Sequence, residues 1–160
     1  MHREGRDRPP RLSAIFQEYD PPLYFVTICA FKRKRLFDSE PFHQAFRDFC
    51  LRGHVEKGIA VGRYVLMPDH IHLFLRLPSH VRLQQWERML KLVLGRTLQE
   101  LGHEPEFWQR GFFDHVIRHS ESYSGKWQYV RDNPVRAGLV SRAEDWPYQG
   151  EIVVIDRVSL

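Results

Sequence analysis

Two histidines lie two residues apart in the segment His70-Ile71-His72, inside a run of residues typical of a β-strand. Side chains at positions i and i+2 of a strand point to the same face, so both imidazoles project together while Ile71 turns toward the opposite, core side. Two neutral imidazoles on one rigid strand supply half of a site for Zn, Mn, Fe, Co or Cu. The motif is short, and two surface or hydrogen-bonded histidines are its alternative interpretation.

A tyrosine and an asparagine stand four residues apart, at Tyr129 and Asn133, in a stretch that predicts a helix. Residues i and i+4 lie one above the other on the same helical face. An amide oxygen added to two imidazoles would leave a divalent ion with open positions for phosphate oxygens. A tyrosine beside such an ion is a candidate nucleophile, because a nearby cation stabilises the phenolate.

Both residues also have structural interpretations. Asn133 directly precedes Pro134 and could cap the following helical turn. Tyr129 could instead be a core aromatic residue of an amphipathic helix. Three other tyrosines compete for the role of nucleophile: Tyr24, Tyr64 and Tyr123.

Length and charge bound the class of protein. The 160 residues suffice for about one domain, and 42% hydrophobic with 28% charged residues is typical of a globular chain. Of the 24 basic residues 19 are arginine, against 20 acidic residues, giving a net charge of +4. Arginine binds phosphate with two parallel hydrogen bonds and stacks on bases, so this surplus favours a nucleic-acid partner.

The chain shows no pattern for export or for membrane insertion. The charged start lacks an apolar signal-peptide core, and no apolar run reaches the length of about 20 residues that a spanning helix needs. Two cysteines, Cys29 and Cys50, form no CxxC pair. We therefore expect a reduced, cytoplasmic protein that does not enter a membrane.

The order of elements predicts an α+β protein: a single mostly antiparallel sheet flanked by helices, in which hairpin-linked strands alternate with helices. A basic N-terminal arm is expected over residues 1–20 and one domain over residues 21–160. The expected strands are 23–30, 59–67, 70–77, 112–117 and a last one over 152–155. Three helices are expected. The first begins at Asp38 or Ser39 and ends at Gly53, the second runs from 81 to 101, and the third runs from Ser120 or Ser122 to about Asn133. A short turn from Pro134 to Gly138 follows.

Four segments together resemble one known family, the REP-associated tyrosine transposases, which belong to the single-tyrosine HUH nuclease superfamily. The resemblance extends from about Leu23 to Pro147. Its segments are YFVT (24–27), VLMPDHIHL (65–73), WQRGFFDH (108–115) and YVRDNPVRAGLV (129–140).

The resemblance implies a ferredoxin-like sandwich and a metal-dependent DNA transposase. By position, His70 and His72 would bind a divalent ion, Mg or Mn, and Asn133 would be the third, polar ligand. Tyr129 would attack a phosphate of single-stranded DNA and leave a 5′-phosphotyrosine link with a free 3′-OH. The family acts on hairpin DNA of repetitive extragenic palindromes, as a monomer or as a homodimer that exchanges the tyrosine helix.

Eleven basic residues are candidates for DNA contact, with a merely solvated basic surface as the alternative. Helix 84–101 is less basic than the family leads us to expect, which weakens a DNA contact there. The candidates are Arg6, Arg8, Arg11, Lys32, Arg33, Lys34, Arg35, Arg110, Arg118, Arg131 and Arg136. Two rival functions remain: a catalytically silent module that binds structured DNA, and a metal-dependent hydrolase unrelated to DNA, against which the basic charge balance argues.

Overall fold

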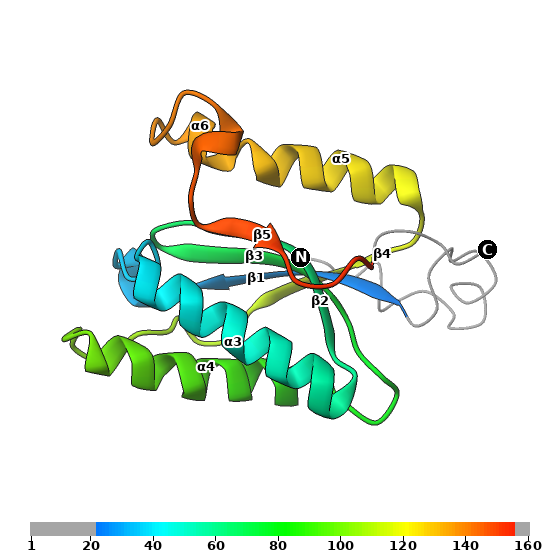
Figure 1. The fold of residues 1–160 in the computed structure, drawn as a ribbon, viewed down its shortest axis with the longest axis horizontal. Coiled ribbons are helices and arrows are strands. Elements are labelled where there is room, and N and C mark those ends of the chain that lie inside the picture. Colours follow the sequence, from blue (N-terminus) through cyan, green and yellow to red (C-terminus); the bar gives the residue numbers. More distant parts are fainter. Residues whose placement is uncertain (1–21, 156–160) are drawn as a thin grey trace.

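A five-stranded antiparallel sheet forms the centre of the protein in a computed structural model, which describes residues 22–155 (Figure 1). Its strands lie in the order β4-β1-β3-β2-β5. They are β1 (Leu23–Cys29), β2 (Ala60–Leu66), β3 (His70–Arg76), β4 (Phe113–Ile117) and β5 (Gln149–Glu151). The first four strands and the two helices between them follow the β-α-β-β-α-β order of a ferredoxin-like unit. The predicted α+β antiparallel sheet is therefore confirmed.

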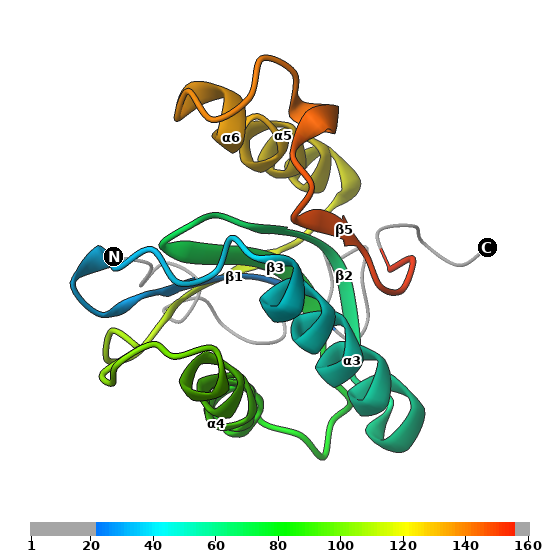
Figure 2. The same ribbon diagram turned by 60° about the vertical axis from the view of Figure 1, so that its left-hand side comes forward.

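Helices cover both faces of this sheet. The long helices α3 (Glu40–Lys57) and α4 (Leu83–Glu100) lie on one face, and α5 (Ser120–Arg131) with the short α6 (Asn133–Arg136) lies on the other (Figures 1 and 2). Single 3-10 turns, η1 (Phe31–Arg33) and η2 (Ala143–Asp145), follow β1 and precede β5. Among the helices of residues 22–155, none combines the length and apolarity needed to cross a bilayer.

Strand β3 divides its side chains between two apolar layers. Ile71, Leu73 and Leu75 are fully buried in the layer beneath α3 and α4. Phe74 belongs to the second layer, beneath α5, and shares that face with His70 and His72 because side chains alternate along a strand. The histidines thus lie on the face that α5 and α6 cover, while Ile71 turns into the opposite core, as the spacing predicts.

Two predicted boundaries are wrong. Helix α3 begins after Ser39, whose hydroxyl caps it as expected, but it runs through Gly53 and ends at Gly58. A mid-helix glycine costs only about 1 kcal/mol, which the buried face of α3 outweighs. Gly58 ends the helix because its φ of 73° is left-handed.

The last strand is β5, Gln149–Glu151, rather than residues 152–155. It pairs antiparallel with β2, with Gly150 opposite Tyr64. The apolar residue Ile155, which suggested a strand, instead packs over Gly62 of β2. Its burial comes from packing on the face of the sheet beneath α5, a role that alternating hydrophobicity alone does not distinguish from pairing.

We expect Gly150→Ala to lower the free energy of unfolding by about 1–3 kcal/mol, the usual cost of overpacking. An alanine Cβ there would lie 2.7 Å from the Tyr64 hydroxyl oxygen and 3.1 Å from Arg47 Nη1. Tyr64 has no room to retreat, because it is fully buried and its hydroxyl is hydrogen-bonded to His43 Nε2 at 2.7 Å and to Arg47 at 2.8 Å. Urea unfolding measures the change.

Gly125→Ala is the matched control for that substitution. Gly125 lies within α5, and nothing stands within 4 Å of an added Cβ. Alanine there should raise the free energy of unfolding by about 0.5–1 kcal/mol, because glycine is the poorer helix former. Shifts of the same sign at both positions would contradict this description of the packing.

Candidate active site

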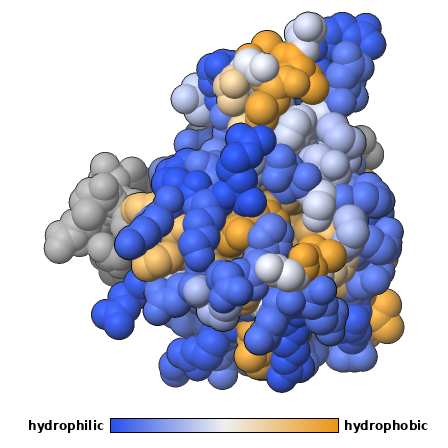
Figure 3. All heavy atoms as spheres, turned by 90° about the vertical axis from the view of Figure 1, so that its left-hand side faces the viewer, coloured by the Kyte–Doolittle hydropathy of each residue, from blue (hydrophilic) through white to orange (hydrophobic). Residues whose placement is uncertain are grey.

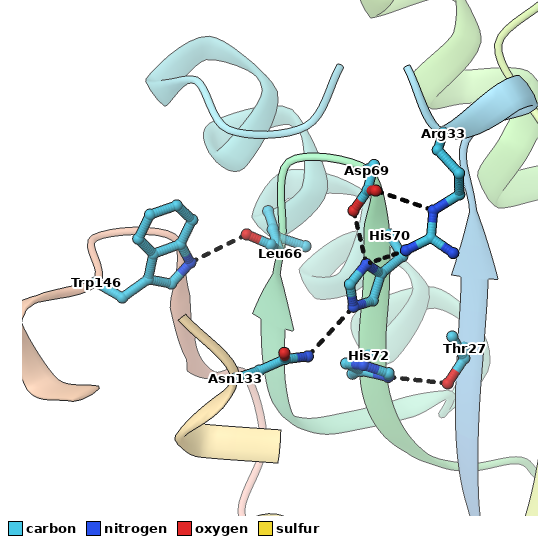
Figure 4. A network of polar contacts seen from close by, with 8 residues as sticks. All are labelled: Thr27, Arg33, Leu66, Asp69, His70, His72, Asn133 and Trp146. Carbon is cyan, nitrogen blue, oxygen red and sulfur yellow. Dashed lines mark hydrogen bonds and ion pairs between the residues drawn. The ribbon is translucent and has the colours of Figure 1, made fainter. Parts of the chain in front are cut away.

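His70 is held in place through its Nδ1 atom at the start of β3. That nitrogen donates to Asp69 Oδ1 at 2.8 Å, and the other Asp69 oxygen accepts from Arg33 Nε at 2.9 Å (Figure 4). Burial alone would raise the pKa of the Asp69 carboxyl, but the bonds from Arg33 and His70 outweigh it and lower that pKa. The carboxylate fixes the tautomer of His70, so the lone pair of Nε2 points into the site.

His72 is oriented by β1, the neighbouring strand. Thr27 lies directly opposite His72 in the pairing, and its hydroxyl lies 2.9 Å from His72 Nδ1 (Figure 4). The ring also stacks on Phe25, with centroids 5.4 Å apart. Burial first, and then the nearby charges of His70, Lys126, Arg136 and Arg33, lower the pKa of His72 to about 3. The imidazole is therefore neutral at pH 7, which is the form that binds a metal ion.

The third candidate ligand, Asn133, reaches the two histidines from a helix rather than from the sheet. It opens α6, and its amide nitrogen lies 3.2 Å from His70 Nε2 (Figure 4). The cap position of α6 is occupied by Asp132, and no side-chain bond caps that helix. The interpretation of Asn133 as a cap is therefore wrong, and its side chain is directed at the histidine pair.

Tyr129 lies near the end of α5, four residues before Asn133, and the two residues are separated by the break between α5 and α6 at Asp132. Its side chain is 64% exposed, so the alternative of a core aromatic residue is wrong. The guanidinium carbon of Arg136 lies 3.7 Å from the centroid of the tyrosine ring. Within residues 22–155 no hydrogen bond joins the Tyr129 hydroxyl to His70, His72 or Asn133. The tyrosine stands beside the site rather than in contact with the imidazoles.

The competing tyrosines lie in packed surroundings. Tyr64 is fully buried between α3 and the sheet, and Tyr123, which belongs to α5, is 3% exposed and packs against Phe74 of β3. Tyr24 packs on the side of the sheet that faces α3 and α4, away from the histidines. Tyr129 is therefore the one of the four that a long polymer could reach from the α6 side of the site.

The donor set suits a hard or borderline divalent cation. Within the described part of the chain, no three His, Cys, Asp or Glu side chains are arranged so that they could hold a metal ion. Two imidazoles and an amide do, at His70, His72 and Asn133. A rotation of the Asn133 amide group by about 180° would direct its oxygen, in place of its nitrogen, toward the histidine pair, because the two amide atoms occupy nearly equivalent positions. Both histidines also have the second hydrogen bond, to a carboxylate or a hydroxyl, that orients metal ligands.

The basic candidates for DNA contact divide into exposed and engaged groups. Lys32, Arg110 and Arg136 are exposed. Arg33 binds Asp69 and thereby belongs to the histidine site. Lys34 donates to the backbone carbonyls of Glu104 and Glu106. Arg35 forms an ion pair with Asp38, and Arg131 lies 3.6 Å from Glu144. Arg118 is partly buried. Arg6, Arg8 and Arg11 lie outside the described residues.

Hydrophilic side chains cover most of the face seen when the site end of the sheet is turned toward the viewer (Figure 3). Apolar side chains gather at its top, over the segment that holds α6. Such a mixture of polar and apolar groups suits a nucleic acid, whose phosphates are charged and whose bases stack.

A family model described as "Transposase IS200 like" matches residues 22–133. The chain belongs to the IS200-like transposase family. It is 28% identical over 140 residues to a Haemophilus influenzae protein named "Putative REP-associated tyrosine transposase", covering 79% of this chain and 77% of that one. It is 24% identical over 127 residues to the REP-associated tyrosine transposase of Escherichia coli, covering 78% and 73%.

A solved structure shares the fold of this IS200-like transposase. It is the structure of a REP-associated tyrosine transposase bound to a REP hairpin, with a TM-score of 0.64 and 22% identity. The match covers 80% of this chain and 75% of that one.

Three residues of the site were not predicted from the sequence of this transposase. Asp69 directly precedes His70, and a carboxylate beside a candidate metal histidine is a signal that could have been used. Thr27 becomes visible only when β1 and β3 are set in register. Lys126 precedes Tyr129 by three residues, so helical spacing could have placed it on the same face.

Proposed function

We propose that this IS200-like transposase nicks single-stranded DNA and transfers the cut strand, with Tyr129 as the nucleophile. The observation that carries the proposal is that Asn133 of α6 lies close to His70 and His72 of β3. Asn133 follows Tyr129 by four residues. Because α5 and α6 hold both Tyr129 and Asn133, a phosphate placed against the donor set lies within reach of the tyrosine.

The reaction conserves the energy of the phosphodiester bond. The Tyr129 oxygen attacks the phosphorus, its proton leaves to solvent, and the bond from phosphorus to the 3′ oxygen breaks. The product is a 5′-phosphotyrosine link, while the released 3′ oxygen takes up a proton. Attack by another DNA 3′-OH on that link reverses the chemistry and joins two strands, which explains how one residue serves for both cutting and transfer.

His70, His72 and Asn133 would hold a divalent ion, Mg or Mn, through two ring nitrogens and an amide oxygen. When bound, such an ion polarises the phosphate and stabilises the charge that develops in the transition state. The protein keeps the two imidazoles neutral and orients their free ring nitrogens toward the ion. Asp69 orients His70 and Thr27 orients His72 through hydrogen bonds, and Arg136, stacked on Tyr129, restricts the tyrosine ring.

We further propose hairpin DNA with a single-stranded flank as the substrate. The relationship to REP-associated tyrosine transposases supports this choice, as does the exposure of Lys32, Arg110 and Arg136 around the site. Hairpin stems are recognised by shape and phosphates, whereas an unpaired flank can enter a site and present its backbone to a nucleophile.

A denaturing gel tests the proposal. The wild-type protein is incubated with a labelled hairpin oligonucleotide that carries a single-stranded flank, in the presence of Mn. We expect a protein–DNA adduct that resists denaturation, together with a shorter strand ending in a 3′-OH. Hairpin binding without an adduct would favour the silent binding module, and the absence of both would favour a function unrelated to DNA.

The two lysines of the η1 region should differ in their effect on DNA binding. Lys32 is exposed, so Lys32→Ala should reduce the slope of log affinity against log salt by about 0.7–0.9, the loss of one phosphate contact. The Lys34 ammonium donates hydrogen bonds to two backbone carbonyls, so Lys34→Ala should leave the slope unchanged while lowering thermal stability. Fluorescence anisotropy between about 50 and 200 mM salt measures both slopes. Equal slopes in the two variants would contradict the assignment.

A further inference from the structure

Lys126 lies on α5, one turn before Tyr129, and reaches inward toward the sheet rather than out to solvent. Its ammonium nitrogen lies 5.1 Å from the centroid of the Phe25 ring. Phe25 in turn stacks against His72 at an interplanar angle of 20°. The ammonium group is therefore placed at the histidine site by two successive ring contacts.

Among the residues whose side chains the structure describes, Lys126 forms no ion pair with a carboxylate. Two other partly buried cations are paired with carboxylates, Lys91 with Glu87 and Arg63 with Glu151.

Two further cations lie near the candidate residues: Arg33 Nη2 lies 3.2 Å from His70 Nδ1, and the guanidinium carbon of Arg136 lies 3.7 Å from the centroid of the Tyr129 ring. Arg33 is bonded to the Asp69 carboxylate. The site therefore carries a local excess of positive charge on the side of Lys126 and Arg136. Such an excess attracts a phosphate group, and partial burial strengthens the attraction.

We propose that Lys126 binds the non-bridging oxygens of the scissile phosphodiester, and so is a substrate-binding residue of this site. This inference rests on the proposed function. The ammonium has three donors on a flexible stem, which suits a phosphate whose oxygens must rearrange during attack. Lys126 shares α5 with Tyr129, three residues away, and its ammonium lies over the ring that stacks on His72, so a phosphate bound there would be near both groups.

A structural role is the rival explanation, in which Lys126 only covers Phe25. Both roles predict that Lys126→Met alters the protein, so a change in activity alone does not separate them. They differ in whether the effect depends on the charge of one particular phosphate of the DNA. A double-mutant cycle between the lysine and that phosphate measures this dependence.

The experiment uses the full chain with Tyr129→Phe, so that DNA binds without being cut, in buffer with EDTA. Hairpin oligonucleotides carry a neutral methylphosphonate at one linkage of the single-stranded flank, moved along the flank one linkage at a time. We expect Lys126→Met to weaken binding of unmodified DNA about tenfold, a typical loss for a charge-assisted contact. That loss should disappear when the neutral linkage is the scissile one and persist at the others. Lys126→Arg should retain most of the affinity.

Lys32→Met is the matched control, because Lys32 is exposed on η1 and its effect should not depend on the charge of the scissile linkage. Thermal melting of Lys126→Met verifies folding, and the methionine stem can still cover Phe25. A loss of affinity that is the same at every modified linkage, or no loss at all, would overturn the inference.

The two proposals fail in different ways. If wild-type protein forms no DNA adduct, the proposed function fails, whatever the binding cycle shows. If wild type forms the adduct but Lys126 shows no coupling to the scissile linkage, the assignment of Lys126 alone is wrong.

Discussion

Tyr129→Phe should abolish the denaturation-resistant DNA adduct, with a loss of at least about 10³-fold in its rate of formation. The substitution removes one oxygen, the atom that would form the bond to phosphorus, and leaves the ring beneath Arg136. Because the side chain is 64% exposed, the fold should be unaffected, and hairpin binding should stay close to the wild-type value. Adduct formation on denaturing gels and anisotropy with the same oligonucleotide measure the two properties separately.

Tyr24→Phe is the matched control for this experiment. It removes the same atom from a tyrosine of β1 that packs on the opposite side of the sheet. The rate of adduct formation should remain within about twofold of wild type, since a hydroxyl far from the reacting atoms contributes little to catalysis. An adduct formed by Tyr129→Phe at the wild-type rate would show that another residue is the nucleophile.

His72→Ala should lower both Mn affinity and the rate of nicking by at least about 100-fold, more than the loss of a residue that only orients a metal ligand causes. The ring is held by Thr27 and by stacking on Phe25, so no other side chain can replace its nitrogen at the site. Electron paramagnetic resonance of free Mn gives the affinity without any DNA. His72→Phe, which keeps a ring that can stack on Phe25 and offers no metal-binding atom, separates the loss of a ligand from the loss of packing.

His54→Ala is the control for metal binding. His54 is exposed on α3, on the opposite face of the sheet, and should not affect Mn affinity. A normal Mn affinity in both His72 variants would contradict the metal site. A loss of affinity in His54→Ala of similar size would show that the measured binding is not specific to the paired histidines.

The fold was predictable where side-chain periodicity and burial agree. The side chains of β3 alternate between two buried layers, and α3 and α4 each bury one face. The order of strands and helices along the chain therefore followed from the spacing of apolar residues. The end of α3 was missed because a single glycine, Gly53, is tolerated inside a helix whose face is well packed. The last strand was misplaced because the burial of Ile155 comes from a contact with Gly62, 93 positions earlier in the sequence, that no local pattern encodes.

The candidate site was predictable to the extent that it depends on local spacing. The i, i+2 rule placed His70 beside His72. The i, i+4 rule paired Tyr129 with Asn133, although the helix is interrupted between them at Asp132, where α5 ends and α6 begins. The contacts that orient these groups cross the sheet or join distant loops, as Thr27 does to His72 and Arg33 to Asp69. Those contacts depend on strand register and on the turn at η1, which spacing along one strand does not specify.

The covalent link itself offers the most direct measurement of the central claim. Trypsin cleaves after Lys126 and Arg131, so residues 127–131 form a peptide, WQYVR, whose one hydroxyl is that of Tyr129. The wild-type adduct is digested with nuclease and trypsin and analysed by tandem mass spectrometry. We expect the mass of a 5′-phosphorylated nucleotide on this peptide, at the tyrosine. The same mass on the preceding peptide, residues 119–126, which contains Tyr123, would contradict the assignment of Tyr129 as the nucleophile.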